Sequence, residues 1–278
     1  MPQVHLIDRG VVAVAGADAS PFLDGLVTCD IDKVQAGRPR LGALLSPQGK
    51  ILFDFLAHRV EDGFLLEVAR VFAPDLVKRL ALYRLRAKVT VDDRSDAHAV
   101  HAGWDAPPPA GAAADPRLAV LGWRAILPAD AAGADAEPDD YHARRIALGV
   151  PEGGRDFLFG DAFPHEALMD QLHGVDFDKG CYVGQEVVSR MQHRGTARSR
   201  VLPLTYVEGF VAEAGVEVLA GDRPVGRTGT ALRGRGLALL RLDRVAEARA
   251  AGLPIRAGGL EVTVDLPAFA TFGWPAVA

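Results

Sequence analysis

A single cysteine lies in a glycine-rich segment at residues 179–186, KGCYVGQE. Cys181 comes shortly before a segment expected to be helical from residue 185, so it would feel the positive end of the helix dipole, and Lys179 adds a second positive charge. Both charges favour the thiolate, which is the form that acts as a nucleophile or metal ligand. The flanking glycines would let a ligand approach closely. The alternative is a buried thiol that packs as a small hydrophobic group.

A strip of basic residues follows this cysteine. No acidic residue occurs over residues 187–207, although the chain as a whole carries a net charge of −5. The strip suits a carboxylate, a phosphate or an RNA backbone, but it lacks the interleaved aromatic residues of a single-stranded RNA platform. A small anion is therefore favoured over a nucleic acid, with a solvated helix end as the alternative. The basic residues are Arg190, His193, Arg194, Arg198 and Arg200.

Upstream, Glu166 places a carboxylate in an otherwise apolar stretch. Such a group can accept hydrogen bonds from the N–H groups of a heterocycle and fix its orientation; an ordinary surface glutamate is the alternative. The sequence contains no phosphate-binding glycine loop, zinc-protease motif or paired-cysteine motif. Because the chain has two cysteines, it cannot build a four-cysteine zinc or iron–sulfur site alone. No metal site is predicted.

Composition indicates a folded chain with a sizeable core. Of the 278 residues, 49% are hydrophobic and 24% are charged, which is typical of globular domains. The net negative charge argues against non-specific coating of nucleic acid. The first residues lack a basic leader, and no apolar run approaches the length of a membrane span. A cytoplasmic location, two reduced thiols and no membrane partner are therefore expected.

The spacing of apolar residues and turns predicts an α+β fold. In the first hundred residues, turns at 46–49 and 61–63 join strands into an antiparallel meander. The C-terminal part has short strands separated by Gly and Pro turns, which is typical of a small β-barrel. The predicted strands are 10–15, 41–45, 51–60, 64–68, 89–91, 118–127, 201–206, 216–218, 237–242 and 260–264; the predicted helices begin at 20 and 74 and cover 141–148 and 185–191; the predicted loops are 103–116 and 128–139.

A change in character near residues 199–202 indicates a domain boundary. Residues 1–200 are expected to form the main body, with sub-lobes at about 1–98 and 99–200. Residues 201–278 are expected to form the barrel.

These segments resemble the signature of the YgfZ family, the folate-binding, iron–sulfur-associated relatives of the glycine cleavage T-protein, an aminomethyltransferase. The resemblance rests on KGCYVGQE with Arg190 and the HRG of residues 193–195. It extends over most of the chain, through residues 22–28 (FLDGLVT), 45–50 (LSPQGK), 145–152 (RIALGVPE) and 225–243. It implies a T-protein-like, three-lobed α+β body with antiparallel sheets, a C-terminal β-barrel and a central pocket for tetrahydrofolate or a derivative.

The resemblance also implies the residues that would act. Glu166 matches the glutamate that contacts the pterin, Cys181 matches the functional cysteine, and Asp75 falls near the catalytic aspartate of T-protein. The implied folate-binding residues are Glu166, Tyr182, Gln185, Arg190, Arg194 and Arg198, and the implied catalytic residues are Cys181, Lys179 and Asp75.

Four positions depart from the family patterns. Ala147 replaces a glutamate of T-protein, Gln185 replaces a basic group of its folate pocket, and Val68 replaces the asparagine of an Asn-Ala pair. These changes count against aminomethyl transfer. Leu168 replaces the asparagine of the YgfZ pattern E-x-N, which would remove a polar contact near the pocket.

Three functions are compatible with the sequence. The first is a folate-binding accessory protein for the assembly or maintenance of iron–sulfur enzymes, including those that thiolate tRNA, with client enzymes or assembly proteins as partners. The second is a folate-dependent one-carbon (aminomethyl) transferase, which is the one conventional enzyme of the three. The third is an RNA-binding module that uses the strip at residues 190–200, although RNA contact is not favoured.

Overall fold

The computed structural model describes residues 2–131, 133–195 and 197–277. The chain forms two compact units. Unit 1 holds the described residues of Met1–Tyr141 together with Leu172–Val187, and unit 2 holds those of His142–Gln171 and Val188–Ala278. Ala132 of the predicted loop 128–139 and Thr196 of the basic strip lie outside the described residues.

A five-stranded sheet forms the larger part of unit 1, with the strand order β3-β4-β5-β2-β6. All of its strand pairs are antiparallel. The turn at residues 61–62 joins β4 to β5, and Gly63 just after it has a φ of 153°, which suits glycine. Because β3, β4 and β5 are neighbours in chain order, the predicted meander is confirmed. The strands are β2 (Arg9–Ala15), β3 (Arg40–Leu45), β4 (Ile51–Val60), β5 (Gly63–Ala69) and β6 (Thr90–Asp93).

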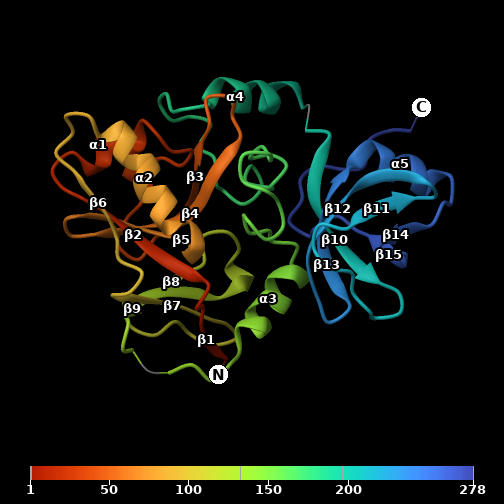
Figure 1. The fold of residues 1–278 in the computed structure, drawn as a ribbon, viewed down its shortest axis with the longest axis horizontal. Helices are drawn as coiled ribbons and strands as arrows, with labels where there is room; N and C mark the ends of the chain where they lie inside the picture. The colour runs from red at the N-terminus through yellow and green to blue at the C-terminus, as the bar shows by residue number, and fades with distance from the viewer. Residues whose placement is uncertain (1, 132, 196, 278) are drawn as a thin grey trace. The chain divides into compact units, whose positions relative to one another are not determined.

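Two helices, α1 (Ala19–Asp24) and α2 (Ala73–Arg84), cover one face of this sheet (Figure 1). Leu23 of α1 and Leu76 of α2 are fully buried in the same hydrophobic core as Phe64 of the sheet. Pro74 stands in the first turn of α2, where its missing N–H has no helical partner to lose. Short 3-10 turns lie at Ile31–Lys33 and Arg70–Phe72.

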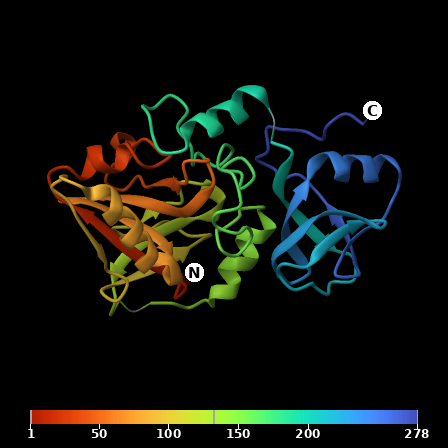
Figure 2. The same cartoon turned by 45° about the horizontal axis from the view of Figure 1, so that its top comes forward.

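A second sheet, of four strands in the order β1-β7-β9-β8, lies under the other face of the first (Figure 2). The predicted strand 118–127 is interrupted at Gly122, whose φ of 98° is not that of a strand. Glycine is required there, because a side chain would clash with the Gly103 carbonyl. A 3-10 turn (Ala119–Leu121) precedes the break. The strands are β1 (Gln3–His5), β7 (His98–Gly103), β8 (Ala113–Ala114) and β9 (Trp123–Pro128).

Buried charges connect the two sheets of unit 1. The Glu67 Oε1 atom lies 3.1 Å from Arg9 Nε and 3.1 Å from Arg124 Nη1. Burial alone would raise the pKa of the Glu67 carboxyl, but Arg124, His58 and Arg9 together outweigh it and hold that pKa far below its usual range. This carboxylate is therefore ionised and structural.

Unit 2 is built around a closed barrel with the strand order β10-β13-β12-β11-β14-β15. Its core includes Leu204, Leu240 and Val262, and helix α5 packs Val245 against them. The α+β class, the antiparallel sheets and the C-terminal barrel are thus confirmed. The elements are β10 (Ser199–Tyr206), β11 (Glu217–Ala220), β12 (Arg223–Leu232), β13 (Arg235–Arg241), α5 (Leu242–Ala250), β14 (Ile255–Ala257) and β15 (Leu260–Val264).

Two further helices, α3 (Pro138–Ala147) and α4 (Gln185–Arg194), each have residues in both units. Between them, residues 148–184 run mainly through turns and irregular backbone. No helix among the described residues has both the length and the apolar character needed to cross a membrane.

Candidate functional site: an anchored thiol loop and a basic helix

Residues 174–184 form a loop on unit 1, here named the thiol loop. Cys181 is an exposed free cysteine on this loop, and Gly180 beside it is exposed as well. On either side, the Lys179 side chain is 2% exposed and Tyr182 is 7% exposed. The thiol therefore lies at the surface between two buried side chains.

The ammonium group of Lys179 is held by backbone oxygens. It donates hydrogen bonds to the carbonyls of Asp24 (2.7 Å), Val27 (3.0 Å) and Cys29 (2.9 Å). It also lies 2.9 Å from the Asp24 carboxylate. Since Asp24 is the last residue of α1, the ammonium caps the end of a helix, where carbonyls lack partners and a positive charge is favourable.

A second anchor lies at the start of the thiol loop. Asp176 accepts hydrogen bonds from the Asp30 N–H (2.8 Å), from Lys33 Nζ (2.8 Å) and from Arg40 Nη2 (3.0 Å). Burial opposes ionisation of Asp176, but these donors, led by Lys33, hold the pKa of the carboxyl below its ordinary value. The Thr28 hydroxyl adds a buried hydrogen bond of 2.6 Å to the Gly174 carbonyl.

A third anchor follows the cysteine. Burial raises the pKa of the Tyr182 hydroxyl to about 12, so this side chain is neutral at physiological pH. Val183 packs against the main core of unit 1. Gly184 has a φ of 81°, and a Cβ there would lie 2.5 Å from the Ser46 carbonyl, so glycine is required. Helix α4 begins at Gln185, whose N–H donates to the Tyr182 carbonyl at 3.2 Å.

The second cysteine has a different environment. Cys29 is 0% exposed, and burial raises the pKa of its thiol to about 12. A Cβ added at Gly42 would lie 2.6 Å from its sulfur, so strand β3 packs directly against the thiol. Cys29 is therefore a neutral core residue.

In unit 2, Glu166 lies on a segment that is tied to both α4 and β10. Its carboxylate accepts a hydrogen bond of 2.8 Å from the Phe163 N–H, and its carbonyl accepts one of 2.8 Å from the Val201 N–H. The neighbouring His165 ring bonds to the Gln192 amide on α4 at 3.0 Å. The structure thus brings the carboxylate-bearing segment next to the elements that carry the basic strip.

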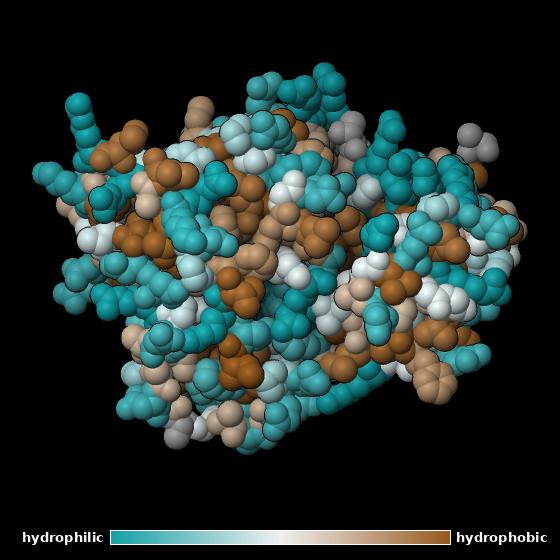
Figure 3. Space-filling model, in the orientation of Figure 1, coloured by the Kyte–Doolittle hydropathy of each residue, from teal (hydrophilic) through white to brown (hydrophobic). Residues whose placement is uncertain are grey.

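Arg190, Arg194 and Arg198 of the strip are exposed. The part of the surface at which α4 lies in Figure 1 is covered by hydrophilic groups in Figure 3. Arg200 differs from the other three, because its guanidinium is buried, pairs with Asp170 at 2.8 Å and stacks on the Phe272 ring. It holds the barrel to the segment before it and adds nothing to the exposed strip.

Asp75 and Leu168, which the sequence also pointed to, lie outside the thiol loop and the basic strip. Asp75 lies in the first turn of α2 with a side chain 60% exposed, and it pairs with Lys78 at 3.2 Å. Leu168 is fully buried with a φ of 59°, a left-handed conformation that asparagine adopts more readily than leucine. The asparagine of the resembled pattern thus matches a backbone requirement at this position.

Sequence reasoning missed the residues that anchor the thiol loop, namely Asp24, Thr28 and Asp176. The signal available was weak. Thr28 lies in the segment 22–28 that carries part of the resemblance, and Asp176 lies three residues before Lys179. Neither position has a spacing that indicates a partner about 150 residues away in the chain.

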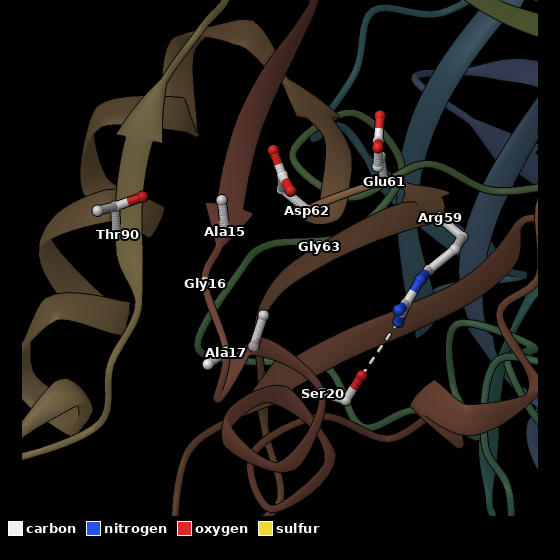
Figure 4. Close-up of a pocket in the computed structure, with 10 residues that line it drawn as sticks. Ala15, Gly16, Ala17, Ser20, Arg59, Glu61, Asp62, Gly63 and Thr90 are labelled. Atoms are coloured by element: carbon white, nitrogen blue, oxygen red, sulfur yellow. Dashed lines mark hydrogen bonds between the residues drawn. The ribbon is translucent and has the colours of Figure 1, made fainter.

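A cavity of about 560 Å³ lies elsewhere on unit 1 (Figure 4). Arg59 reaches across it and donates a hydrogen bond to the Ser20 hydroxyl at 3.1 Å. Most of the remaining lining is Ala, Gly and the acidic pair Glu61 and Asp62. None of the predicted site residues lines it.

The fold and the barrel place the chain in the class of T-protein-like proteins. The GCVT N-terminal domain family matches residues 4–102, and the CAF17 C-terminal beta-barrel domain family matches residues 198–272. The crystal structure of the glycine cleavage system aminomethyltransferase T from Bartonella henselae is similar, with a TM-score of 0.74 over 97% of this chain and 86% of that one. At 15% identity this similarity concerns the fold alone.

Full-length similarity defines the family more narrowly. The human mitochondrial iron–sulfur cluster assembly factor IBA57 is 34% identical over 87% of this chain and 78% of its own length. The mitochondrial IBA57 homologue of Mycosarcoma maydis is 37% identical over 71% of this chain, but the match spans only 55% of that relative. The chain belongs to the IBA57 family of iron–sulfur cluster assembly factors.

Two expectations change with these comparisons. The T-protein-like relationship is confirmed, and the full-length relatives reported above carry the name IBA57, which replaces the YgfZ name suggested by the motifs. The expected cytoplasmic location is wrong by the same comparison, because the relatives from Mycosarcoma maydis, human and Neurospora crassa are named as mitochondrial. That expectation rested on the composition of the first residues, which carries no information on this point.

Proposed function

We propose that this protein is an accessory factor in iron–sulfur cluster assembly and that Cys181 is its functional thiol. The observation that carries the proposal is the exposed cysteine on a loop with three anchors, in a chain whose relatives are named as iron–sulfur cluster assembly factors. A surface thiol without a structural role is available to bind iron, sulfur or a partner.

The number of thiols determines how such a site would work. Cys29 is buried and neutral, so Cys181 is the one cysteine of the chain that is exposed at the native surface. Iron–sulfur clusters are usually held by four protein ligands. The chain would therefore hold a cluster together with ligands from a partner, which suits an assembly factor that contacts client enzymes or other assembly proteins.

Reduced folate is proposed as a ligand of the same protein. The chemistry of the side chains supports this proposal, since the half-buried Glu166 carboxylate is fixed by the Phe163 N–H and can accept from pterin N–H groups. The exposed guanidinium groups suit the glutamyl carboxylates. Bound tetrahydrofolate would supply a carrier of one-carbon groups. The residues of unit 2 proposed to hold it are Glu166, Arg190, Arg194 and Arg198.

A more specific role is also proposed, namely the maintenance of iron–sulfur enzymes that thiolate tRNA. It rests on the resemblance of the KGCYVGQE motif to the YgfZ signature. Aminomethyl transfer is the less favoured function. Asp75 is exposed and paired with a lysine of its own helix, which gives no support to a role as catalytic base. Direct RNA binding would rest on three exposed arginines and is likewise not favoured.

Complementation tests the main proposal. A host lacking its own IBA57-type gene is supplied with wild type, Cys181→Ala or Cys29→Ala at equal protein abundance, and the activities of its iron–sulfur enzymes and the level of methylthiolated tRNA are measured. We expect rescue by wild type and by Cys29→Ala, and loss of rescue by Cys181→Ala. Rescue by all three would contradict a functional thiol at position 181.

Folate binding is tested separately on purified protein. Tetrahydrofolate should raise the unfolding temperature of wild type, because a ligand that binds the native state alone stabilises it. Glu166→Gln should reduce this increase, and Glu61→Gln, which changes an exposed glutamate of unit 1, should not. A parallel assay for aminomethyl transfer should show no turnover.

A further inference from the structure

Cys181 is held in place by the residues on either side of it in the thiol loop. Gly180 is exposed, and among the described residues no atom beyond its chain neighbours lies within 4 Å of the position that its Cβ would take. Cys181 itself is exposed. The loop at this point is therefore located by the residues that flank it, Lys179 on one side and Tyr182 on the other.

Lys179 is the nearer fixed point on the amino-terminal side. An ammonium group has three N–H donors, and the three carbonyls of Asp24, Val27 and Cys29 lie at 2.7–3.0 Å from it. A tetrahedral cation can meet three acceptors from different directions at once. The residues that supply them, 24–29, lead from the end of α1 towards the main core of unit 1, so this fixed point is itself rigid.

The charge of this lysine is balanced locally. The Asp24 carboxylate lies 2.9 Å from the ammonium, so the surroundings experience an ion pair. The Lys179 ammonium also lies 5.5 Å from the centre of the Tyr182 ring, which links the two fixed points on either side of the cysteine. These contacts indicate that Lys179 holds the loop in place. A lysine whose positive charge activates the thiol would be expected to have no neighbouring carboxylate.

We infer that Lys179 is the positioning residue for Cys181: by capping the carboxyl end of α1, its ammonium fixes the exposed thiol in the orientation used in iron–sulfur assembly. This inference rests on the function proposed above. It assigns Lys179 no contact with iron, sulfur or folate. Its consequence is that loss of the lysine frees the thiol without removing it.

A nitroxide spin label on Cys181 measures this directly. In a Cys29→Ala background Cys181 is the one cysteine left, and the label reports the mobility of the loop through its line shape. Lys179→Met should convert the spectrum from a largely immobile to a largely mobile form. Lys78→Met removes an exposed lysine that pairs with Asp75 on α2 and should leave the spectrum unchanged.

A stability control separates positioning from general loosening of the fold. Val12→Ala removes buried atoms from the core of unit 1 away from the loop, and its spectrum should stay immobile when its unfolding temperature falls as far as that of Lys179→Met. Lys179→Arg keeps charge and donors in a planar group and should give an intermediate spectrum; it also serves if the methionine variant does not fold. A wild-type spectrum in both Lys179 variants would overturn the inference.

Asp24→Asn tests positioning against activation by charge. It removes the counter-ion but leaves the three carbonyl acceptors, so the label should stay immobile although the ammonium charge is no longer balanced. A mobile label would contradict a purely geometric role. In the complementation host, Lys179→Met should lose as much rescue as Cys181→Ala. If Cys181→Ala itself still rescues, the proposed function fails, while the spectra continue to decide whether Lys179 fixes the loop.

Discussion

The guanidinium of Arg145 and the carboxylate of Asp156 lie 2.6 Å apart, and neither side chain is exposed to solvent. The same carboxylate accepts hydrogen bonds from the N–H groups of Glu152 and Thr230, both at 2.8 Å. A Cβ at Gly229 would lie 2.6 Å from the Asp156 Cα. Strand β12 can therefore approach Asp156 this closely only because residue 229 is a glycine. This one pair therefore joins α3, the segment after it and β12 of the barrel.

Asp156→Asn should destabilise the protein strongly. Removing one member of a buried ion pair leaves an uncompensated charge, which typically costs about 3–5 kcal/mol. The nearby Glu152 carboxylate, 3.4 Å from Arg145 Nε, should offset part of this loss, so we expect a value near the lower end. The free energy of unfolding in urea, followed by circular dichroism, measures it.

The matched control is Asp243→Asn. Asp243 pairs with Arg241 at 2.6 Å, but its side chain is 38% exposed, and exposed pairs contribute roughly 0–1 kcal/mol. Equal destabilisation by the two substitutions would show that burial of the Arg145 pair does not determine its contribution.

The sequence predicts elements well where apolar residues alternate between clear turns. Strand 51–60 is an example, and its predicted bounds match β4. Strands β1 and β7 were not predicted, because they are short or rich in His, Ala and Gly, and their pairing joins residues about 100 positions apart. Helix α5 was also missed, since its apolar side chains gain their burial only against the finished barrel.

The candidate site shows the same division. The motif around Cys181 identified the exposed thiol and the helix that follows it, both of which are local properties. The role expected for Lys179 came from its nearness in sequence to the thiol, whereas the oxygens that bind it come from residues 24–29. Arg200 was counted with the basic strip, because its partners Asp170 and Phe272 lie 30 and 72 positions away.

Acidification should weaken unit 1 through His101. Burial, and then the stacked His5 ring at 5.1 Å, hold the pKa of His101 below its ordinary value. The fold therefore favours the neutral imidazole, and its contribution to stability is complete above the unfolded-state pKa, near 6.5, and declines as the pH falls below that value. Urea unfolding at pH 7.5, 6.5 and 5.5 measures the effect.

His101→Gln should flatten this dependence, because glutamine stays neutral and can still bond to Gln3, which lies 3.3 Å from the native ring. His98→Gln changes a less buried histidine of the same strand and is the control. An equally steep decline in His101→Gln and wild type would assign the acid sensitivity to other groups.

Alkylation should distinguish the two cysteines. Burial raises the pKa of the Cys29 thiol to about 12, so it stays protonated at pH 8, and the thiolate is the reactive form. Iodoacetamide should therefore modify one thiol per native chain, at Cys181, and two in 6 M guanidinium, as read by peptide mass spectrometry. Cys181→Ser should take up no reagent in the native state; modification of Cys29 at the Cys181 rate would show that β3 does not shield it.

Leu85→Gly should stabilise the protein. Leu85 follows α2 with φ 41° and ψ −103°, and its side chain is 89% exposed, so it bears backbone strain and contributes little packing. Relief of such strain, less the entropy that glycine loses on folding, should give about 1 kcal/mol. The matched control is Leu82→Gly, inside α2 and 70% exposed, which should lose about 1 kcal/mol through reduced helix propensity. Thermal unfolding should move the two midpoints in opposite directions; a lower midpoint for Leu85→Gly would mean that the leucine makes a contact worth more than the strain at its backbone.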